Sequence, residues 1–139
     1  MVMYGMVQEL ATWLNYRNLR ERVVERGDPA LSKLLRLIAV DERAHHDFYF
    51  KVTMMYMDRD RDAVVEQLRR VIATFAMPAL HMLAGSSQRA ATIKDLNIFG
   101  PDIFYSDVVR PLLDKMGISW AEFRQRAPGR RALSAPTLP

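Results

Sequence analysis

Apolar residues recur at helical spacing in two long stretches of the chain. Residues 2 to about 26 contain no proline and predict one long helix, and residues 29 to about 57 predict a second. Between them, Gly27 suits a left-handed C-cap, Asp28 an N-cap and Pro29 the first position of the next helix. So short a connection predicts that the two helices are antiparallel neighbours.

The region after the second helix is less regular. Asp60 or Asp62 can cap a third helix that reaches about Phe75, and the sequence Met77-Pro78 interrupts or kinks it. Residues 84–100 are rich in Gly, Ser and Asn, and the segment predicts irregular structure or short turns.

Two further helices close the predicted domain. One runs from about residue 101 to Gly117, and Ser119 can cap a short last helix over 120–126. The Pro, Gly and Ser content of residues 127–139 is typical of a flexible, basic tail. Without a clear strand signal, the pattern predicts an all-α domain over residues 1–126, built as a long antiparallel helix hairpin followed by shorter helices.

The second long helix carries polar residues on an apolar face. Alternating steps of four and three residues pick out Leu31, Leu35, Ile38, Glu42, His45, Tyr49 and Val52. Glu42 and His45 are therefore neighbours on one face, where burying them is costly unless they are paired or bound to a metal. The alternative is a surface Glu–His pair, if that face turns away from the core.

The first helix shows the same anomaly at Glu9. This residue lies among Val2, Met6, Trp13 and Tyr16 on an apolar face, and its neighbours three and four positions away include no basic side chain. When the hairpin is reflected about its turn, Glu9 falls roughly opposite position 46. The sequence thus predicts that Glu9 lies next to His45 and within about one turn of Glu42.

Two carboxylates and one imidazole at one place favour a metal site. Without a counter-charge the carboxylates would repel each other and take up protons. Glu oxygens and a His nitrogen, without sulfur, suit iron or manganese better than structural zinc. Carboxylate-bridged di-metal bundles use one Glu from each of two helices and Glu-x-x-His from each of two others, so this hairpin predicts half a site.

Composition narrows the class of protein. Half of the 139 residues are apolar and there is no cysteine, which excludes disulfides and thiolate chemistry. No apolar run is long enough to span a bilayer and the N-terminus lacks signal-peptide features, so a cytoplasmic protein is expected. The net charge of +4 comes with no nucleic-acid-binding motif, and clustered arginines suit an acidic protein partner instead.

Several motifs together resemble a known family. VQELAT around Glu9 is followed, thirty-three residues from Glu9 to Glu42, by AVDERAHH, and FAMPALHM at 75–82 and LLDKMGI at 112–118 continue the likeness. This order resembles the C-terminal half of the soluble acyl-[acyl carrier protein] desaturases. The resemblance implies a ferritin-like helical bundle, or half of one, with a di-iron centre.

The resemblance also implies roles for individual residues. Glu9, Glu42 and His45 would be iron ligands, Thr12 would lie beside the oxygen-binding side of the metals, and Asp41 would be an outer-shell partner of a ligand histidine. Ordinary helix packing is the alternative for Thr12, and a surface charge for Asp41. Two other histidines stay outside the ligand set: His46 is expected to point outward or to lie in the outer shell, and His81 to be structural or on the surface.

The implied activity is O2-dependent insertion of a double bond into a saturated acyl chain, in fatty acid metabolism. The substrate would arrive on acyl carrier protein and the electrons from a ferredoxin-type donor. The family's other Glu and Glu-x-x-His are absent from these residues, so the isolated chain is expected to be an inactive, N-terminally truncated desaturase. The alternatives are a homodimeric metal-binding half-bundle without desaturase activity, and a degenerate helical module used for binding.

Overall fold

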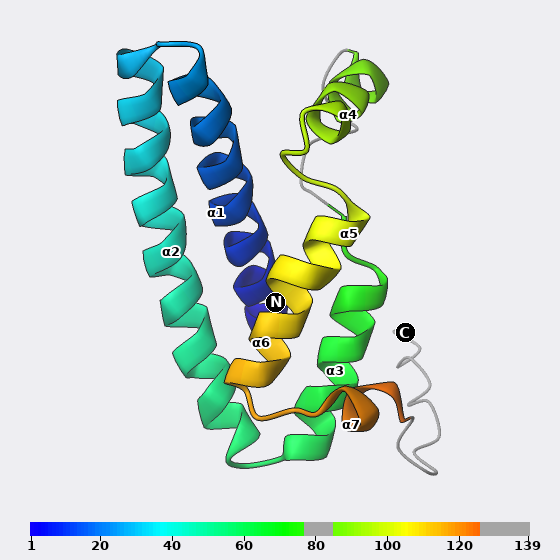
Figure 1. Cartoon of the computed structure of the whole chain (residues 1–139). Coiled ribbons are helices and arrows are strands. Elements are labelled where there is room, and N and C mark those ends of the chain that lie inside the picture. Colours follow the sequence, from blue (N-terminus) through cyan, green and yellow to red (C-terminus); the bar gives the residue numbers. More distant parts are fainter. Residues whose placement is uncertain (77–84, 126–139) are drawn as a thin grey trace, which may run out of the picture.

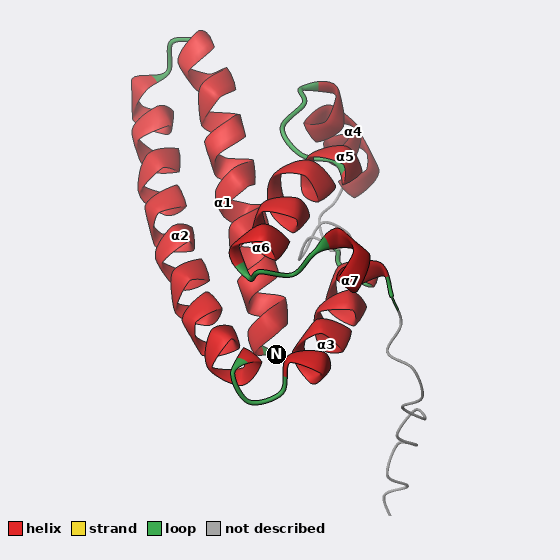
Figure 2. Ribbon diagram, turned by 60° about the horizontal axis from the view of Figure 1, so that its bottom comes forward, coloured by secondary structure: helices red, strands yellow, loops and turns green. Residues whose placement is uncertain are grey.

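The computed structural model describes residues 1–76 and 85–125, and all regular elements in these two ranges are helices (Figure 2). They are α1 (Val2–Glu25), α2 (Pro29–Met57), α3 (Arg61–Ala73), α4 (Ser86–Asp95), α5 (Pro101–Ile103), the π-helix η2 (Phe104–Val109), α6 (Arg110–Lys115) and α7 (Trp120–Arg124). The all-α prediction is confirmed. None of the described helices is long and apolar enough to cross a membrane.

The hairpin of α1 and α2 forms as predicted (Figure 1). Gly27 adopts a positive φ of 75°, which favours glycine because a Cβ crowds this backbone conformation. The Asp28 side chain accepts a hydrogen bond of 2.9 Å from the Leu31 amide, and Pro29 begins α2 where its missing N–H costs nothing. These three residues end one helix and start the next antiparallel to it.

Most of the core lies on the side of α1 that faces away from α2, and Met57 at the end of α2 joins it. Both ribbon views place α1 between α2 and the shorter helices, with α2 at the outer edge (Figures 1 and 2). The buried side chains of α1 meet those of α3, η2 and α6 in one cluster, which includes Met6, Val7, Leu10, Leu14, Val64, Leu68, Val108, Leu112 and Leu113. The hairpin is therefore held on one flank by the core, and no helix of the described ranges covers the outer flank of α2.

A close approach between the long helices depends on Gly5. A Cβ at this position would lie 2.9 Å from the Tyr49 ring, closer than side chains pack. Glycine weakens a helix interior by about 1 kcal/mol relative to alanine. At Gly5 the absence of a side chain allows Tyr49 of α2 to lie directly on the backbone of α1, and this contact offsets the cost.

The expectation of irregular structure over residues 84–100 is wrong for most of that segment. Ser86–Asp95 forms the ten-residue helix α4, flanked by Gly85 with φ 70° and Asn97 with φ 52°. Its interior contains no glycine or proline, but most of its side chains are exposed, so no apolar face marks it in the sequence. Gly85 and Asn97 therefore mark the two ends of this helix, not an irregular loop.

The helix predicted over residues 101–117 is present but changes character in the middle. Phe104–Val109 is π-helical, and α6 follows with Pro111 in its first turn. Pro111 has no N–H to donate to the Asp107 carbonyl, and its ring would clash with that group in a regular α-helix. A wider π-turn relieves both problems, and Gly117 with φ 65° then ends the helix as expected.

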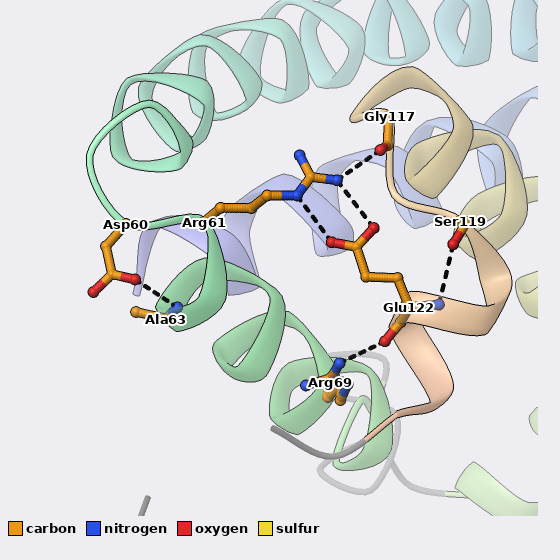
Figure 3. A network of polar contacts seen from close by, with 7 residues as sticks. All are labelled: Asp60, Arg61, Ala63, Arg69, Gly117, Ser119 and Glu122. Atoms are coloured by element: carbon orange, nitrogen blue, oxygen red, sulfur yellow. Dashed lines mark hydrogen bonds and ion pairs between the residues drawn. The ribbon is translucent and has the colours of Figure 1, made fainter. Parts of the chain in front are cut away.

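The short helix α7 is attached to α3 by arginines (Figure 3). Ser119 caps it by accepting from the Glu122 amide, as predicted. The Arg61 guanidinium donates two hydrogen bonds, of 2.9 and 3.1 Å, to the Glu122 carboxylate and a third to the Gly117 carbonyl. Arg69 donates to the Glu122 and Phe123 carbonyls at the end of the helix. The predicted interruption at Met77-Pro78, His81 and the tail 127–139 lie outside the described residues.

Because Arg69 is the less exposed of two arginines that contact Glu66, it allows a matched test of this attachment. We expect Arg69→Met to lower the free energy of unfolding by about 1–3 kcal/mol, since its hydrogen bonds to two α7 carbonyls are lost. Arg70→Met, which also loses a contact with Glu66 but touches no α7 carbonyl, should change it by less than about 0.5 kcal/mol. Urea denaturation followed by circular dichroism measures both, and equal effects would contradict the role given to Arg69.

Candidate metal centre

The three predicted ligand residues meet between the two long helices. Glu9 comes from the second turn of α1, and Glu42 and His45 lie one turn apart in the middle of α2. One oxygen of each carboxylate and one imidazole nitrogen all lie within 4.8 Å of one another. Among the described residues this is the one such group of acidic and histidine side chains. The convergence predicted from the hairpin is confirmed.

The histidine sits at the open side of this cluster. Its Nδ1 lies 3.7 Å from Glu9 Oε2 and 3.9 Å from Glu42 Oε2. The side chains of Glu9 and Glu42 are 15% and 18% exposed, whereas that of His45 is 60% exposed. The carboxylates are therefore enclosed by the hairpin, and the imidazole forms the rim that faces outward.

The surroundings of Glu9 and Glu42 disfavour the state in which both side chains are ionised. Burial, followed by the neighbouring Glu9 carboxyl group, raises the pKa of Glu42 from 4.5 to about 7. His45 and a hydrogen bond with Thr12 act in the opposite direction but do not compensate. At neutral pH the cluster therefore holds a proton that a divalent cation would displace.

Two other glutamates of the described chain are neutralised by arginine. Glu66 pairs with Arg69 and Arg70, and Glu122 with Arg61, and each pair holds the pKa of its carboxyl group below the usual value. Among the described residues, neither Glu9 nor Glu42 has an arginine or lysine partner; their polar neighbours are each other, His45 and, for Glu42, the Thr12 hydroxyl. The site therefore lacks the counter-charge that the fold supplies elsewhere.

Thr12 lies at the edge of the cluster on the helix turn after Glu9. Its hydroxyl donates a 2.8 Å hydrogen bond to the Gln8 carbonyl, and the same oxygen lies 3.4 Å from Glu42 Oε2. The hydroxyl has one proton, which it can donate either to the Gln8 carbonyl or to Glu42 Oε2, and donation to this carboxylate acts to lower the pKa of Glu42. Both readings of Thr12, helix packing and a site contact, describe part of its geometry.

Asp41 and His46, which flank the ligand residues on α2, lie in different surroundings. Asp41 is exposed, and within residues 1–76 and 85–125 it makes no hydrogen bond or ion pair. His46 is 1% exposed, so it does not point outward: its Nδ1 lies 2.8 Å from the Met6 carbonyl, and burial lowers its pKa. A neutral His46 that donates to Met6 ties α2 to α1 directly behind the ligand pair.

The donor set fits a divalent iron or manganese ion, but only in part. Two carboxylate oxygens and one imidazole nitrogen are the ligand types that these metals take in proteins. Three ligands leave an iron or manganese site incomplete, and a bridged pair of metals needs about twice that number. The described residues therefore provide one side of such a site, and its open side is the rim at His45.

A second feature of the hairpin, a groove lined by arginines of both long helices, was not predicted from the sequence. Arg17 and Arg20 of α1 and Arg36 and Arg43 of α2 line a groove of about 300 Å3 around Trp13. The Arg17 and Arg43 guanidinium groups lie 5.1 and 5.2 Å from the Trp13 ring. The spacing of Arg36 and Arg43, two helical turns apart, was the available signal, but only the folded hairpin joins them to the arginines of α1.

Comparisons with known proteins bear on the family of this chain. A family model described as fatty acid desaturase matches residues 1–132. The putative acyl-[acyl-carrier-protein] desaturase DesA1 of Mycobacterium tuberculosis is 29% identical over 84% of this chain and 33% of its own length. Acyl-[acyl-carrier-protein] desaturase 3, chloroplastic, of Oryza sativa is 27% identical over 93% of this chain and 33% of its own. No solved structure matches significantly.

A third relative shares a shorter region. The chloroplastic stearoyl-[acyl-carrier-protein] 9-desaturase of Solanum commersonii is 33% identical over 59% of this chain. The chain spans about a third of the length of the first two relatives, so the comparisons concern one part of those enzymes. Since the family model covers nearly the whole chain, and these relatives are of one kind, the chain belongs to the acyl-[acyl-carrier-protein] desaturase family of fatty acid desaturases.

Proposed function

We propose that this chain supplies half of the di-iron centre of an acyl-[acyl carrier protein] desaturase, with Glu9, Glu42 and His45 as iron ligands. The observation that supports the proposal is that ligand atoms of these three side chains lie within 4.8 Å of one another in a family member, with no arginine or lysine partner among residues 1–76 and 85–125. A bound pair of ferrous ions would supply O2 activation. The overall change is removal of two hydrogens from a saturated acyl chain, and O2 is reduced to two waters by these two hydrogens together with two electrons from an external donor and two protons from solvent.

The residues of this chain have separate tasks in that reaction. Glu9 and Glu42 neutralise the metal charge and hold it between the long helices, where their low exposure limits the access of water. Thr12, 3.4 Å from Glu42 Oε2, orients that carboxylate and lines the site beside it. Asp41 would fix the orientation of a ligand histidine from outside the coordination shell, as outer-shell carboxylates do.

The centre needs a second helix pair that contributes another Glu and Glu-x-x-His. Such a pair could belong to a longer polypeptide or to a second copy of the chain. With three ligands alone, we expect the chain to lack desaturase activity. That requirement also separates this proposal from a degenerate helical module, in which the ligand residues would have no effect on metal content.

The arginine groove supports an acidic protein partner. The hairpin has a concentrated positive charge around the half-buried Trp13, from Arg17, Arg20, Arg36 and Arg43. We propose that acyl carrier protein, named in the descriptions of the relatives, docks here to deliver the acyl chain. A ferredoxin-type donor and a cytoplasmic location complete the proposal, while the rice and Solanum relatives are described as chloroplastic.

Metal binding tests the ligand assignment directly. We expect the protein to bind Mn2+, used as an air-stable probe, and we expect Glu9→Gln or His45→Ala to weaken binding at least 10-fold because one of three ligands is lost. Glu21→Gln, an exposed acid on α1, serves as the control and should bind as the unmodified chain does. Isothermal titration calorimetry measures these affinities, and equal binding by all variants would contradict the site.

The raised pKa of Glu42 predicts a pH dependence of metal-free stability. The folded state holds a proton up to about pH 7 that the unfolded state releases near pH 4.5. The stabilisation is therefore complete below pH 4.5 and is lost as pH rises through 7, by at most about 3 kcal/mol. Glu42→Gln should abolish this slope and Glu21→Gln should keep it, as measured by urea denaturation between pH 4.5 and 8. A slope that survives in Glu42→Gln would assign the titration to another group.

Charge reversal tests the docking groove. Because electrostatic attraction steers acidic partners, we expect Arg20→Glu with Arg36→Glu to weaken binding of an acyl-acyl carrier protein about 10-fold or more, and added salt to weaken it in the unmodified chain. Arg70→Glu reverses a charge on α3, outside the groove, and is the matched control. Fluorescence anisotropy with labelled acyl carrier protein gives the affinities. Equal losses for the groove and control variants would show that only net charge matters.

A further inference from the structure

His46 is buried against α1, although His45, the residue before it, is exposed. The His46 side chain is 1% exposed, and Ser32 and Thr53 are the other buried polar residues in the described ranges. Burying an imidazole is costly unless it finds a hydrogen-bond partner. The place of His46 inside the hairpin therefore depends on such a partner, and α1 supplies one.

The hydrogen bond of His46 reaches the backbone of α1. Its Nδ1 lies 2.8 Å from the Met6 carbonyl oxygen. A carbonyl oxygen only accepts hydrogen bonds, so Nδ1 carries a proton and donates it. Met6 lies inside α1, where a carbonyl oxygen has a second lone pair for such a donor. The bond can therefore join α2 to α1 without replacing a helical hydrogen bond of α1.

This hydrogen bond lies about one helical turn from both ligand carboxylates. Met6 precedes Glu9 by three residues on α1, and His46 follows Glu42 by four residues on α2. Residues at these spacings lie on one face of a helix. The bond and the two carboxylates therefore share the seam between the long helices.

The ring of His46 is also covered by residues of α2 and α6. The Phe50 ring lies 6.0 Å from the imidazole, centroid to centroid, in a tilted arrangement. The Lys115 ammonium group of α6 lies 4.0 Å from the centre of the Phe50 ring and 3.7 Å from the Asp47 carboxylate. Packing of this kind restricts the imidazole to one orientation, which a side chain that positions its neighbours requires.

A hydrogen bond restricts the hairpin in a way that apolar packing does not. It weakens steeply when donor and acceptor move out of line, so it limits both the rotation of α2 about its axis and its shift along α1. Consecutive residues of a helix lie about 100° apart around its axis, so a His46 that points at Met6 leaves His45 at the rim of the ligand cluster. There the His45 Nδ1 is 3.7 Å from Glu9 Oε2.

The contacts beside the carboxylates have a repulsion to oppose. Glu9 and Glu42 have no arginine or lysine partner among the described residues, and they repel each other when both are ionised. That repulsion acts to separate α1 from α2 at this point of the seam. One turn away, the Tyr49 ring lies on the Gly5 backbone and His46 donates to α1, and both contacts hold the helices together.

We propose that His46 is a positioning residue: the hydrogen bond from its Nδ1 to the Met6 carbonyl sets the separation and rotation of α1 and α2, so that Glu9 and Glu42 meet before any metal binds. The metal role of the two carboxylates rests on the function proposed above, whereas the positioning concerns the metal-free hairpin. His46 touches no metal in this role and acts through the backbone of α1. Ligands held together in advance bind more tightly, because less free energy is lost in ordering them.

Nuclear magnetic resonance of the metal-free chain tests the geometry. We expect a slowly exchanging Nδ1 proton on His46 and nuclear Overhauser effects between the Glu9 and Glu42 side chains. These Glu9–Glu42 contacts should be lost in His46→Leu, which has no donor, and should remain in His46→Asn, whose amide places a donor where Nδ1 lies. Their absence from the unmodified chain, or their persistence in His46→Leu, would overturn the proposal.

Ser32→Ala is the matched control. It removes the 3.2 Å hydrogen bond that Arg20 Nε donates to Ser32 Oγ, which also joins α1 to α2 but lies ten residues from Glu42 along the chain. This variant should keep the Glu9–Glu42 contacts. If they are lost here as well, a general weakening of the hairpin accounts for the effect and His46 has no separate role.

Metal affinity is the second readout, with urea denaturation of each variant measured beside it. At neutral pH we expect His46→Leu to bind Mn2+ at least about 10-fold more weakly than the unmodified chain, as is typical when a residue that orients metal ligands is lost. His46→Asn and Ser32→Ala should bind within about 3-fold of the unmodified chain. A role in stability alone predicts a different pattern, in which the variants unfold at lower urea concentrations but bind Mn2+ with unchanged affinity while folded.

The outcomes separate this role from the metal function. If the unmodified chain binds no Mn2+ but its Glu9–Glu42 contacts depend on His46, the proposed function fails and the positioning role stands. If the unmodified chain and His46→Leu bind Mn2+ equally tightly, the proposed function stands and the positioning role is overturned.

Discussion

The packing of α1 against α2 is the interaction on which the other features of this protein depend. It brings Glu9 to Glu42 and His45, and it encloses two carboxylates so far that the pKa of one rises to about 7. Gly5 permits the close approach of Tyr49, and buried His46 joins the helices through the Met6 carbonyl. The free energy gained from this helix packing keeps the carboxyl groups of Glu9 and Glu42 close together, although burial and their mutual repulsion disfavour two ionised carboxylates there.

The hairpin has two flanks with different tasks. On the inner flank, α3, η2 and α6 cover α1 with an apolar core, and arginine contacts attach α7 to that layer. On the outer flank, α2 carries exposed apolar side chains, among them Leu34, Phe48 and Met55, that no described helix covers. The rim of the metal site at His45 is exposed as well, so a helix pair that completes the site would lie beside α2.

Local signals in the sequence were sufficient for most of the helices. Gly27, Asp28 and Pro29 determine the hairpin turn through backbone and capping preferences that act within a few residues, and Asp60 and Ser119 cap later helices in the same way. The exposed helix α4 was missed because it has no apolar face, and the π-turn at η2 because it arises from one proline inside an otherwise helical pattern.

The sequence by itself determined the long hairpin, its register, and therefore the meeting of Glu9, Glu42 and His45, because a three-residue turn between two regular helices leaves little freedom in how they align. Only the tertiary structure decided which flank of each helix is buried, since that depends on contacts between residues far apart in the chain. It placed His46 inside and His45 outside, and it joined Arg36 and Arg43 to the arginines of α1. It also left apolar side chains of α2 such as Leu34 and Phe48 exposed. Periodicity identifies the apolar positions of a helix, but packing determines which of them meet a partner in the same chain.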